Sequence, residues 1–194
     1  MAQVTDVLEF WFGDPSSKDA EYEQRRKLWF RKQETVDQEI RERFESTYER
    51  AASGQLDSWH NSPEGCLALV IVLDQFPRNM FRNDPNAFAT DAKALAVSQW
   101  AIAQRFDQAL DPIQRLFLYL PFEHSEQLTH QNQSVEHFAR LVNDAPELSD
   151  TYSYAIRHRQ VIERFGRFPH RNSILGRNST PEEREFLKQP GSSF

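Results

Sequence analysis

The chain has 194 residues, of which 39% are hydrophobic and 27% charged, and its formal net charge is -6 at pH 7. Its 15 Phe, 5 Tyr and 4 Trp supply ample apolar area for a core, which excludes a disordered chain. The single cysteine excludes an intramolecular disulfide framework and a multi-cysteine zinc module, and the acidic balance argues against a nucleic-acid partner held by bulk charge.

The N-terminal residues carry Asp6 and Glu9 within their apolar stretch and no basic residue before Lys18, which is unlike a secretory signal. The longest uninterrupted apolar run covers residues 66–73, whereas a membrane-spanning helix needs about 20 apolar residues. We therefore expect a cytoplasmic protein without a membrane partner.

Apolar residues recur at helical spacing along nearly the whole chain. A short first helix is predicted over residues 4–12, where Gly13 ends it, and a second helix over residues 19–30. A third is predicted to begin at Thr35, whose side chain would form a capping box with Gln38.

Proline in the first turn marks three more predicted helix starts, because proline there gives up no hydrogen bond that the helix needs. These starts are Ser62-Pro63, Asp84-Pro85 and Asp111-Pro112. The first of these helices is apolar on all sides over residues 66–73, which predicts a buried, central position. Pro121 is expected to kink or restart the third.

The last third of the chain is predicted to hold three helices. One is centred on Phe138, and a longer one ends at Gly166 in a C-cap position. The last begins with a capping box formed by Thr180 and Glu183.

The sequence contains no Asn-Gly or Asp-Gly hairpin turn and no convincing segment of alternating polarity. The predicted fold is therefore all-α, with about nine helices whose short connections favour antiparallel hairpins. No linker separates two cores, so we expect a single helical domain over residues 1–188 and a frayed C-terminal tail over residues 189–194.

Arginine is far commoner than lysine, since 18 of the 23 basic residues are Arg. One third of the arginines lie within residues 151–177, where Glu163 is the single acid. These are Arg157, Arg159, Arg164, Arg167, Arg171 and Arg177. A guanidinium offers a rigid fork of donors for carboxylate or phosphate oxygens, so the cluster indicates an anion-binding site. The alternative is a set of ion pairs with acids on neighbouring helices.

Two segments share a pattern in which Phe-Pro precedes an Arg and an Asn. They are Gln75-Phe76-Pro77-Arg78-Asn79 and Arg167-Phe168-Pro169-His170-Arg171-Asn172. In one interpretation both are helix exits built on a proline turn, with Phe folded back onto the core. In the other, both turns present Arg and Asn to one shared ligand. Asp74 directly follows the apolar run, so its burial would require a cationic partner such as Arg78.

A third candidate region lies around Pro121. Arg115, Tyr119, Phe122 and Glu126 would share one side of a helix that continues through this proline. Glu123, His124 and Glu126 place three titratable groups within four residues, a set that suits acid–base chemistry or metal binding. The i, i+4 histidine pair typical of zinc sites is absent, so no metal site is predicted. His158 lies in an apolar helical stripe, where a core role is commoner than a catalytic one.

Five segments carry a joint resemblance to a known family. They are Val7-Leu8-Glu9-Phe10-Trp11-Phe12-Gly13, Leu73-Asp74-Gln75-Phe76-Pro77-Arg78-Asn79, Phe117-Leu118-Tyr119-Leu120-Pro121-Phe122-Glu123-His124-Ser125-Glu126, Phe165-Gly166-Arg167-Phe168-Pro169-His170-Arg171-Asn172, and Leu175-Gly176-Arg177 with Ser179-Thr180. Together they resemble the bacterial family catalogued as domain of unknown function 924, over nearly the whole chain. The resemblance implies an all-α, tetratricopeptide-like superhelix and no particular activity.

We expect a protein that binds a small anionic or polar ligand, without a cofactor, because the sequence has no Gly-rich phosphate loop or dinucleotide motif. The predicted ligand-binding residues are Asp74, Arg78, Asn79, Arg115, Glu123, His124, Glu126, His158, Arg167, Arg171, Asn172 and Arg177. The alternative is an interaction scaffold that holds a peptide or an acidic protein tail in a concave helical groove. The first function predicts that these residues converge in one small cavity, and the second that they are spread apart.

Overall fold

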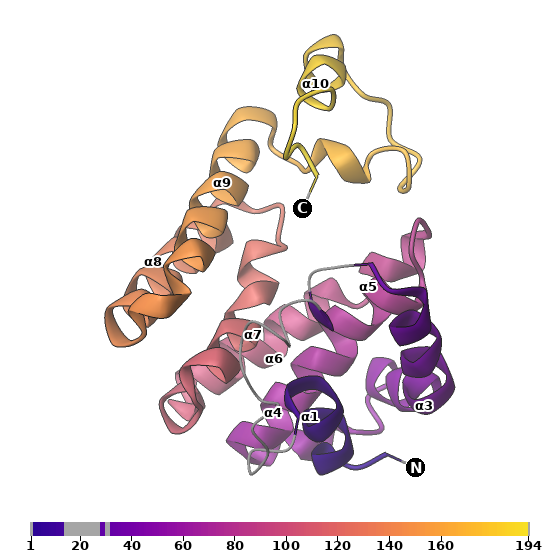
Figure 1. Ribbon diagram of the computed structural model, residues 1–194, viewed down its shortest axis with the longest axis vertical. Helices are drawn as coiled ribbons and strands as arrows, with labels where there is room; N and C mark the ends of the chain where they lie inside the picture. The colour runs from indigo at the N-terminus through magenta and orange to yellow at the C-terminus, as the bar shows by residue number, and fades with distance from the viewer. Residues whose placement is uncertain (1, 14–27, 30–31, 194) are drawn as a thin grey trace. The chain divides into compact units, whose positions relative to one another are not determined.

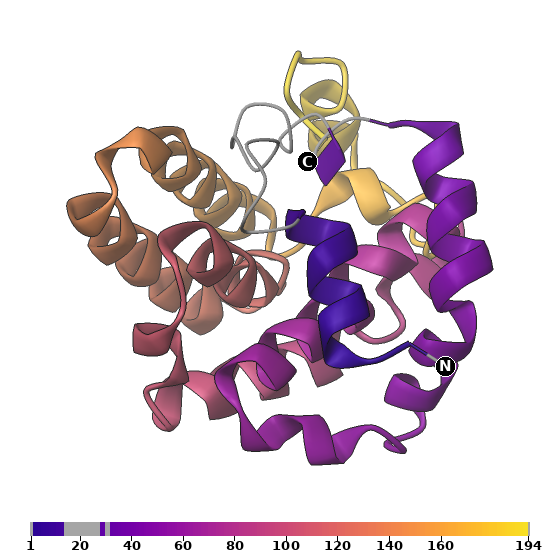
Figure 2. The ribbon, with the colours of Figure 1, turned by 60° about the horizontal axis from the view of Figure 1, so that its bottom comes forward.

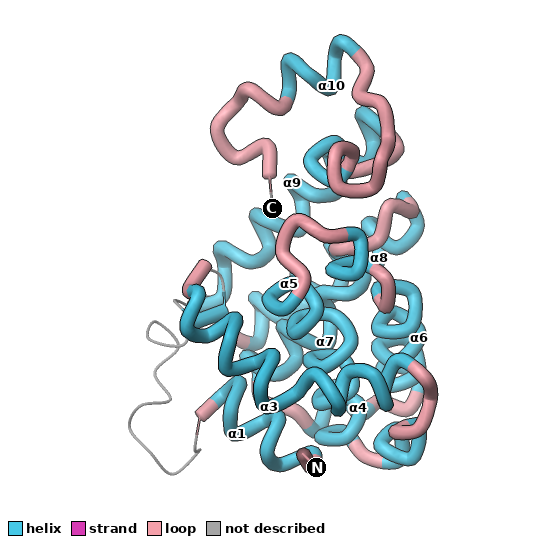
Figure 3. Tube along the Cα trace, turned by 90° about the vertical axis from the view of Figure 1, so that its right-hand side faces the viewer, coloured by secondary structure: helices cyan, strands magenta, loops and turns pink. Residues whose placement is uncertain are grey.

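The computed structural model describes residues 2–13, 28–29 and 32–193 (Figure 1). Every regular element in these residues is helical, as the tube in Figure 3 shows, so the predicted all-α class is confirmed. The α-helices are α1 (Val4–Phe12), α3 (Glu34–Ala52), α4 (Pro63–Val70), α5 (Phe76–Met80), α6 (Asp91–Ala103), α7 (Pro112–Glu123), α8 (Leu128–Asp144), α9 (Ser149–Phe165) and α10 (Pro181–Phe186). The helix predicted over residues 19–30 lies largely outside the described residues.

Shorter helical turns connect these helices. The 3-10 turns are η1 (Asp57–Asn61), η3 (Pro85–Phe88), η4 (Phe106–Ala109), η5 (Pro146–Leu148) and η6 (Pro169–Arg171). A π-helical turn, η2 (Ile71–Gln75), joins α4 directly to α5. It makes α4, η2 and α5 one continuous helical segment.

The chain divides into two compact units. Unit 1 comprises Met1–Arg82 and Asn86–Pro121, and unit 2 comprises Asn83–Pro85 and Phe122–Phe194. The boundary in α7 falls between Pro121 and Phe122. The single domain and the tetratricopeptide-like superhelix stay predictions.

The core of unit 1 is built around the apolar run that the sequence predicts to be central. Residues 66–73 are all buried, and α1 packs against α4 (Figure 2). Trp11 of α1 lies edge-on to both Phe76 and Phe117, at centroid distances of 5.7 and 5.6 Å. The predicted buried, central helix is thus confirmed.

Helix starts follow the predicted caps in two places and depart from them in two others. The Ser62 hydroxyl accepts a hydrogen bond from the Gly65 N–H ahead of α4, and Thr180 forms its capping box with Glu183. The capping box predicted at Thr35 is wrong, because α3 already begins at Glu34. Asp84-Pro85 opens only η3, and α6 begins at Asp91.

In unit 2, α8 and α9 pack side by side (Figure 1). Gly166 ends α9 with a φ of 67°, in the left-handed region that favours glycine, as predicted. Beyond it Phe168 is fully buried against Val161 and Ile162 of α9. The terminal segment, predicted to be frayed, includes Gly191, whose carbonyl accepts a hydrogen bond from Arg157 at 3.1 Å.

Candidate functional site

The predicted ligand-binding residues belong to both units. Asp74, Arg78, Asn79 and Arg115 lie in unit 1, whereas Glu123, His124, Glu126, His158, Arg167, Arg171, Asn172 and Arg177 lie in unit 2. Each group is therefore considered within its own unit.

In unit 1, Asp74 is fully buried, and Arg78 is the cationic partner that its burial requires. Arg78 lies 3.3 Å from Asp74 and forms a two-pronged ion pair with Asp91 at 2.9 and 3.0 Å. Burial lowers the pKa of Arg78, but the two carboxylates outweigh it and raise that pKa above its ordinary value. The Gln75 amide also donates to Asp74 at 2.6 Å. These contacts hold Arg78 between two acids.

The π-turn around Asp74 follows from proline at position 77. Pro77 has no N–H with which to bond the Leu73 carbonyl one turn earlier. The Thr90 hydroxyl donates to that carbonyl instead, at 2.6 Å, and the Arg78 guanidinium donates to the Asp74 carbonyl at 2.6 Å. The Thr90 hydroxyl thus replaces the backbone hydrogen bond that Pro77 cannot form, and the helix continues through Met80, where one interpretation of the sequence predicts a helix exit.

The other two predicted residues of unit 1 are Asn79 and Arg115. Asn79 donates to Asp37 at 2.8 Å, and Arg82 pairs with the same carboxylate. Burial opposes the ionisation of Asp37, but these donors hold its pKa below the ordinary value. Arg115 lies in α7, which ends at Glu123, so the prediction that Glu126 shares a helix face with Arg115 is wrong.

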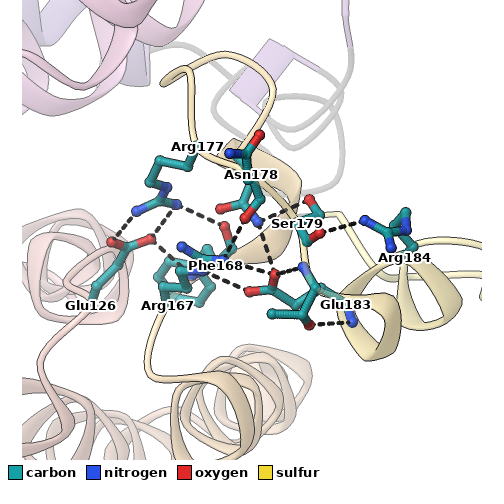
Figure 4. Close-up of polar contacts among 10 residues, drawn as sticks. Glu126, Arg167, Phe168, Arg177, Asn178, Ser179, Glu183 and Arg184 are labelled. Atoms are coloured by element: carbon teal, nitrogen blue, oxygen red, sulfur yellow. Dashed lines mark hydrogen bonds and ion pairs between the residues drawn. The ribbon is translucent and has the colours of Figure 1, made fainter.

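In unit 2 an ion pair anchors the second Phe-Pro segment. Arg177 contacts both carboxylate oxygens of Glu126, at 2.7 and 2.9 Å (Figure 4). Glu126 accepts from the Phe168 N–H at 2.8 Å, and Arg177 donates to the Phe168 carbonyl at 3.1 Å. Burial works against the charge of Glu126, but Arg177 and the Phe168 N–H hold its pKa below the ordinary value. The pair therefore fixes the backbone from which His170 and Arg171 project.

A second ion pair in unit 2 centres on Glu183, which the sequence marks only as a helix cap. Arg167 contacts its two carboxylate oxygens at 2.6 and 2.8 Å, and Asn172 donates to it at 3.3 Å (Figure 4). Glu183 also accepts from the Thr180 N–H. Arg167 foremost, together with Thr180 and Asn172, lowers the pKa of Glu183 to about 2. Arg167 and Asn172 thus hold the C-terminal segment together.

A buried Glu–His contact joins α7 to α9. His158 Nδ1 lies 2.9 Å from the Tyr154 carbonyl and 3.3 Å from Glu123 Oε1. Because a carbonyl can only accept, Nδ1 carries the proton and Nε2 is the acceptor of the ring. Burial, with smaller contributions from positive neighbours, lowers the pKa of His158 to about 3. His158 is therefore neutral at pH 7, and its contact with Glu123 is not an ion pair at that pH.

Three further side chains of unit 2 interact electrostatically with His158. They are His124, His170 and Arg171. Burial, followed by the charge of Arg171, lowers the pKa of His170 to about 4. Arg171 is buried and stacks over the Phe168 ring at 4.7 Å. We name His124, His158, His170 and Arg171 the histidine cluster.

The carbonyl end of α7, which carries Glu123 and His124, is closed by one side chain of α8. The amide of Gln131, fully buried, donates to the carbonyls of Glu123 and Ser125, both at 2.7 Å. This bond pattern fixes the turn from which His124 projects. The sequence analysis singled out neither Gln131 nor His170 as a site residue. The signal for His170 was its place in the Phe-Pro segment, whereas nothing local marks Gln131.

The arginine-rich stretch is largely a set of ion pairs. Arg159 pairs with Glu163, Arg164 with Glu182, Arg167 with Glu183 and Arg177 with Glu126. Arg171 stacks on the Phe168 ring and interacts electrostatically with Glu126, His158 and His170. Within the described residues no group of three or more His, Cys, Asp or Glu side chains could hold a metal ion. The helices described there include none with the length and apolarity to cross a bilayer.

Comparison with known proteins agrees with the resemblance. Residues 7–191 match the family described as bacterial protein of unknown function, DUF924. The chain belongs to the DUF924 family. One similar solved structure is that of the protein of unknown function ATU0120 from Agrobacterium tumefaciens, with 38% sequence identity and a TM-score of 0.82. The match covers 95% of this DUF924 chain and 96% of the other. No functionally curated protein matches the chain.

Proposed function

We propose that this protein binds a small anionic ligand at the histidine cluster of unit 2. The observation that supports this proposal is the position of the Arg171 guanidinium, which stacks on Phe168 and interacts electrostatically with the buried His158 and the half-buried His170. The charge of Arg171 lowers the pKa of both His158 and His170, in addition to the effect of burial. An anion beside these rings would be attracted by the Arg171 guanidinium and would raise the pKa of both imidazoles.

The chemistry of the cluster favours a carboxylate or phosphate group on the ligand. Arg171 would supply parallel N–H donors, and the Phe168 ring beneath its guanidinium would keep the fork in one orientation. His158, held in the Nδ1–H tautomer, would accept a hydrogen bond at Nε2 from a ligand hydroxyl. The ligand would be small, because His158 and Arg171 are only 5% and 7% exposed.

The proposed site keeps His124, His158 and Arg171 of the predicted ligand-binding residues and adds His170. Glu126, Arg167, Asn172 and Arg177 act in this proposal as positioning residues, because their polar groups hold the backbone around Phe168 and Asn172. Arg78 is held by Asp74 and Asp91 and has no direct part in it. The reaction, if one follows binding, would use the Glu123–His158 pair for proton transfer.

Thermal unfolding with inorganic phosphate, sulfate and small di- and tricarboxylates tests the proposal. A ligand at 100 times its Kd stabilises a protein by about 2.7 kcal/mol, so at least one anion is expected to raise Tm by several degrees. Arg171→Lys keeps the charge but loses the fork, and should abolish most of the shift. Arg164→Lys is the matched control, because Arg164 is paired with Glu182 at the surface of the same unit.

Two outcomes would contradict anion binding at the cluster. The first is the absence of a Tm shift with every anion tested, which would favour the interaction scaffold that holds a peptide or acidic tail. The second is an equal shift in the Arg171→Lys variant and the parent protein, which would remove Arg171 from the site.

A further inference from the structure

Unit 1 carries an open groove of about 410 Å³ that the proposed anion site does not use. It lies between η1 and α6, and all of its lining residues belong to unit 1. They are Asp57, His60, Lys93, Ala96, Val97 and Trp100. The volume lies in the lower part of the range typical of small-molecule sites.

One wall of the groove is apolar and exposed. Trp100 is 49% exposed, although an indole of this size is normally buried for most of its area. Ala96 precedes it by one turn of α6, so a small side chain lies beside the large ring. Val97 completes this wall. Such a surface suits the flat or aliphatic part of a ligand.

One charge of each sign borders the groove: Lys93 lies on α6, one turn before Ala96, and Asp57 lies on η1 across from it. The Lys93 ammonium lies 3.8 Å from the nearest oxygen of Asp57, which is longer than a hydrogen bond. Lys93 donates to the Ala52 carbonyl at 3.2 Å, and an ammonium group has three donors, so it has further capacity to donate. Asp57 keeps 60% of its side chain exposed. Both charges are therefore accessible from the groove.

The backbone keeps the space beside these charges open. Gly54, with a φ of 85°, lies where a Cβ would be 3.3 Å from Asp57 Oδ2 and 3.6 Å from Lys93 Nζ. Two contacts connect the elements on either side of the groove: the Trp100 indole N–H donates to the His60 carbonyl at 3.4 Å, and His60 Nδ1 lies 2.9 Å from the Asp57 carbonyl. Trp100 of α6 is thus linked to Asp57 through η1.

We propose that this groove binds a free α-amino acid with an aromatic side chain. A ligand with only a positive charge would be repelled by Lys93, and one with only a negative charge by Asp57. A zwitterion satisfies both, because its carboxylate would meet Lys93 and its ammonium would meet Asp57. The aromatic side chain would lie against Trp100. A peptide end carries only one of these two charges and fits less well.

Calorimetric titration with L-phenylalanine tests this proposal. Saturable binding is expected, and two analogues serve as charge controls. Phenethylamine lacks the carboxylate and 3-phenylpropionate lacks the ammonium, so each should bind at least about tenfold more weakly, equivalent to about 1.4 kcal/mol. Trp100→Ala should abolish detectable binding, whereas Leu128→Ala, which truncates an exposed apolar side chain of unit 2, should leave it unchanged.

A charge variant makes the test independent of the tryptophan. In Lys93→Met the stem remains but the ammonium is lost, so phenylalanine should bind more weakly while phenethylamine should bind no more weakly than to the parent protein. The proposal is overturned if phenylalanine shows no saturable binding, or if the analogues bind as tightly as phenylalanine. A dimer that Trp100→Ala dissociates, seen by sedimentation without phenylalanine binding, would assign the groove to a second copy of the chain and overturn it too.

Discussion

The two Phe-Pro segments have similar letters but different backbones. Residues 76–80 form α5 and extend one helical segment from Pro63 to Met80 through a π-turn. Residues 168–172 follow the C-cap of α9 and form the 3-10 turn η6. Phe76 and Phe168 are nevertheless both fully buried. The apolar residue thus has the same role in both segments, whereas the course of the backbone is different.

The difference begins at the residues that precede each proline. Gly166 has already ended α9 before Pro169, so no helical hydrogen bond is lost there. Before Pro77 the helix is deeply buried, and Thr90 satisfies the Leu73 carbonyl that proline leaves open, while the Arg78 side chain donates to the next carbonyl, that of Asp74. In consequence Arg78 is fixed between acids, whereas Arg171 lies beside imidazoles. Equal motifs therefore do not imply equal roles.

The largest expected effect tests the structural role of Arg78. Arg78→Met would leave the buried Asp74 carboxylate without its guanidinium, which typically costs about 3–5 kcal/mol. Urea unfolding measures this loss of stability. Arg164→Met, which removes a surface ion pair with Glu182, should cost less than about 1 kcal/mol. Equal costs for the two variants would contradict the contrast between a buried and a surface arginine.

The next effect is a dependence of stability on pH that is expected from His158, which contacts the Phe168 ring of the second segment. The pKa of His158 is about 3 in the folded protein, below its ordinary 6.5, so the unfolded chain binds the proton first as the pH falls. The neutral form therefore stabilises the fold fully above pH 6.5, and this stability is lost as the pH falls from 6.5 toward 3. The slope is about 1.4 kcal/mol per pH unit, or about 2 kcal/mol between pH 6.5 and 5.

Unfolding by urea at pH 7, 6 and 5 measures this slope. His158→Gln should reduce this slope, because glutamine does not titrate. The ion pair of Glu183 with Arg167 does not affect the slope in this range, because its stabilising free energy is lost only as the pH falls from about 4.5 toward 2. An unaltered slope in His158→Gln would mean that folding does not lower the pKa of His158.

A smaller effect tests the compensation for Pro77. Thr90→Val removes the hydrogen bond to the Leu73 carbonyl and should cost about 1.5 kcal/mol. Pro77→Ala supplies a backbone N–H one turn from that carbonyl, so Thr90→Val should cost less when combined with Pro77→Ala. A double-mutant cycle of unfolding free energies measures the coupling. Strict additivity would show that Thr90 does not replace the missing backbone bond.

The smallest effect concerns the anchor of the second segment. Arg177→Lys keeps the charge opposite Glu126 but loses one prong of the pair, and both side chains are about a quarter exposed. We expect a cost near 1 kcal/mol in unfolding free energy. The pKa of Glu126 should rise toward its ordinary value, which carbon-detected NMR titration of the carboxylate would record. A larger loss of unfolding free energy in Arg177→Lys than in Arg78→Met would contradict the expectation that the arginine of the first segment contributes more to stability than the arginine that anchors the second.

Local patterns were sufficient where one residue controls its own neighbourhood. Ser62, Gly166 and the Thr180–Glu183 capping box mark helix ends correctly, because their hydrogen bonds or φ angles depend on residues close in sequence. The buried run at residues 66–73 was also predicted, since a helix that is apolar on every side has no face for solvent.

Long-range partners were not predictable in this way. The π-turn depends on Thr90, which lies 17 positions after Leu73, and Arg177 meets Glu126 across 51 positions. The sequence showed that Arg171 and Arg177 are close along the chain. It did not show that Arg177 pairs with a carboxylate while Arg171 lies beside His158 and His170.

By itself, the sequence determined the all-α class, the family, the buried central helix and the main helix caps, because periodicity and capping are short-range properties. Only the tertiary structure decided which acid each arginine meets and that Arg171 also lies near His158 and His170, since these contacts depend on side chains brought together from distant positions. The arginines of this stretch thus have two different roles. Most of the arginine-rich stretch holds helices and turns together, and Arg171 supplies the charge on which the proposed anion site depends.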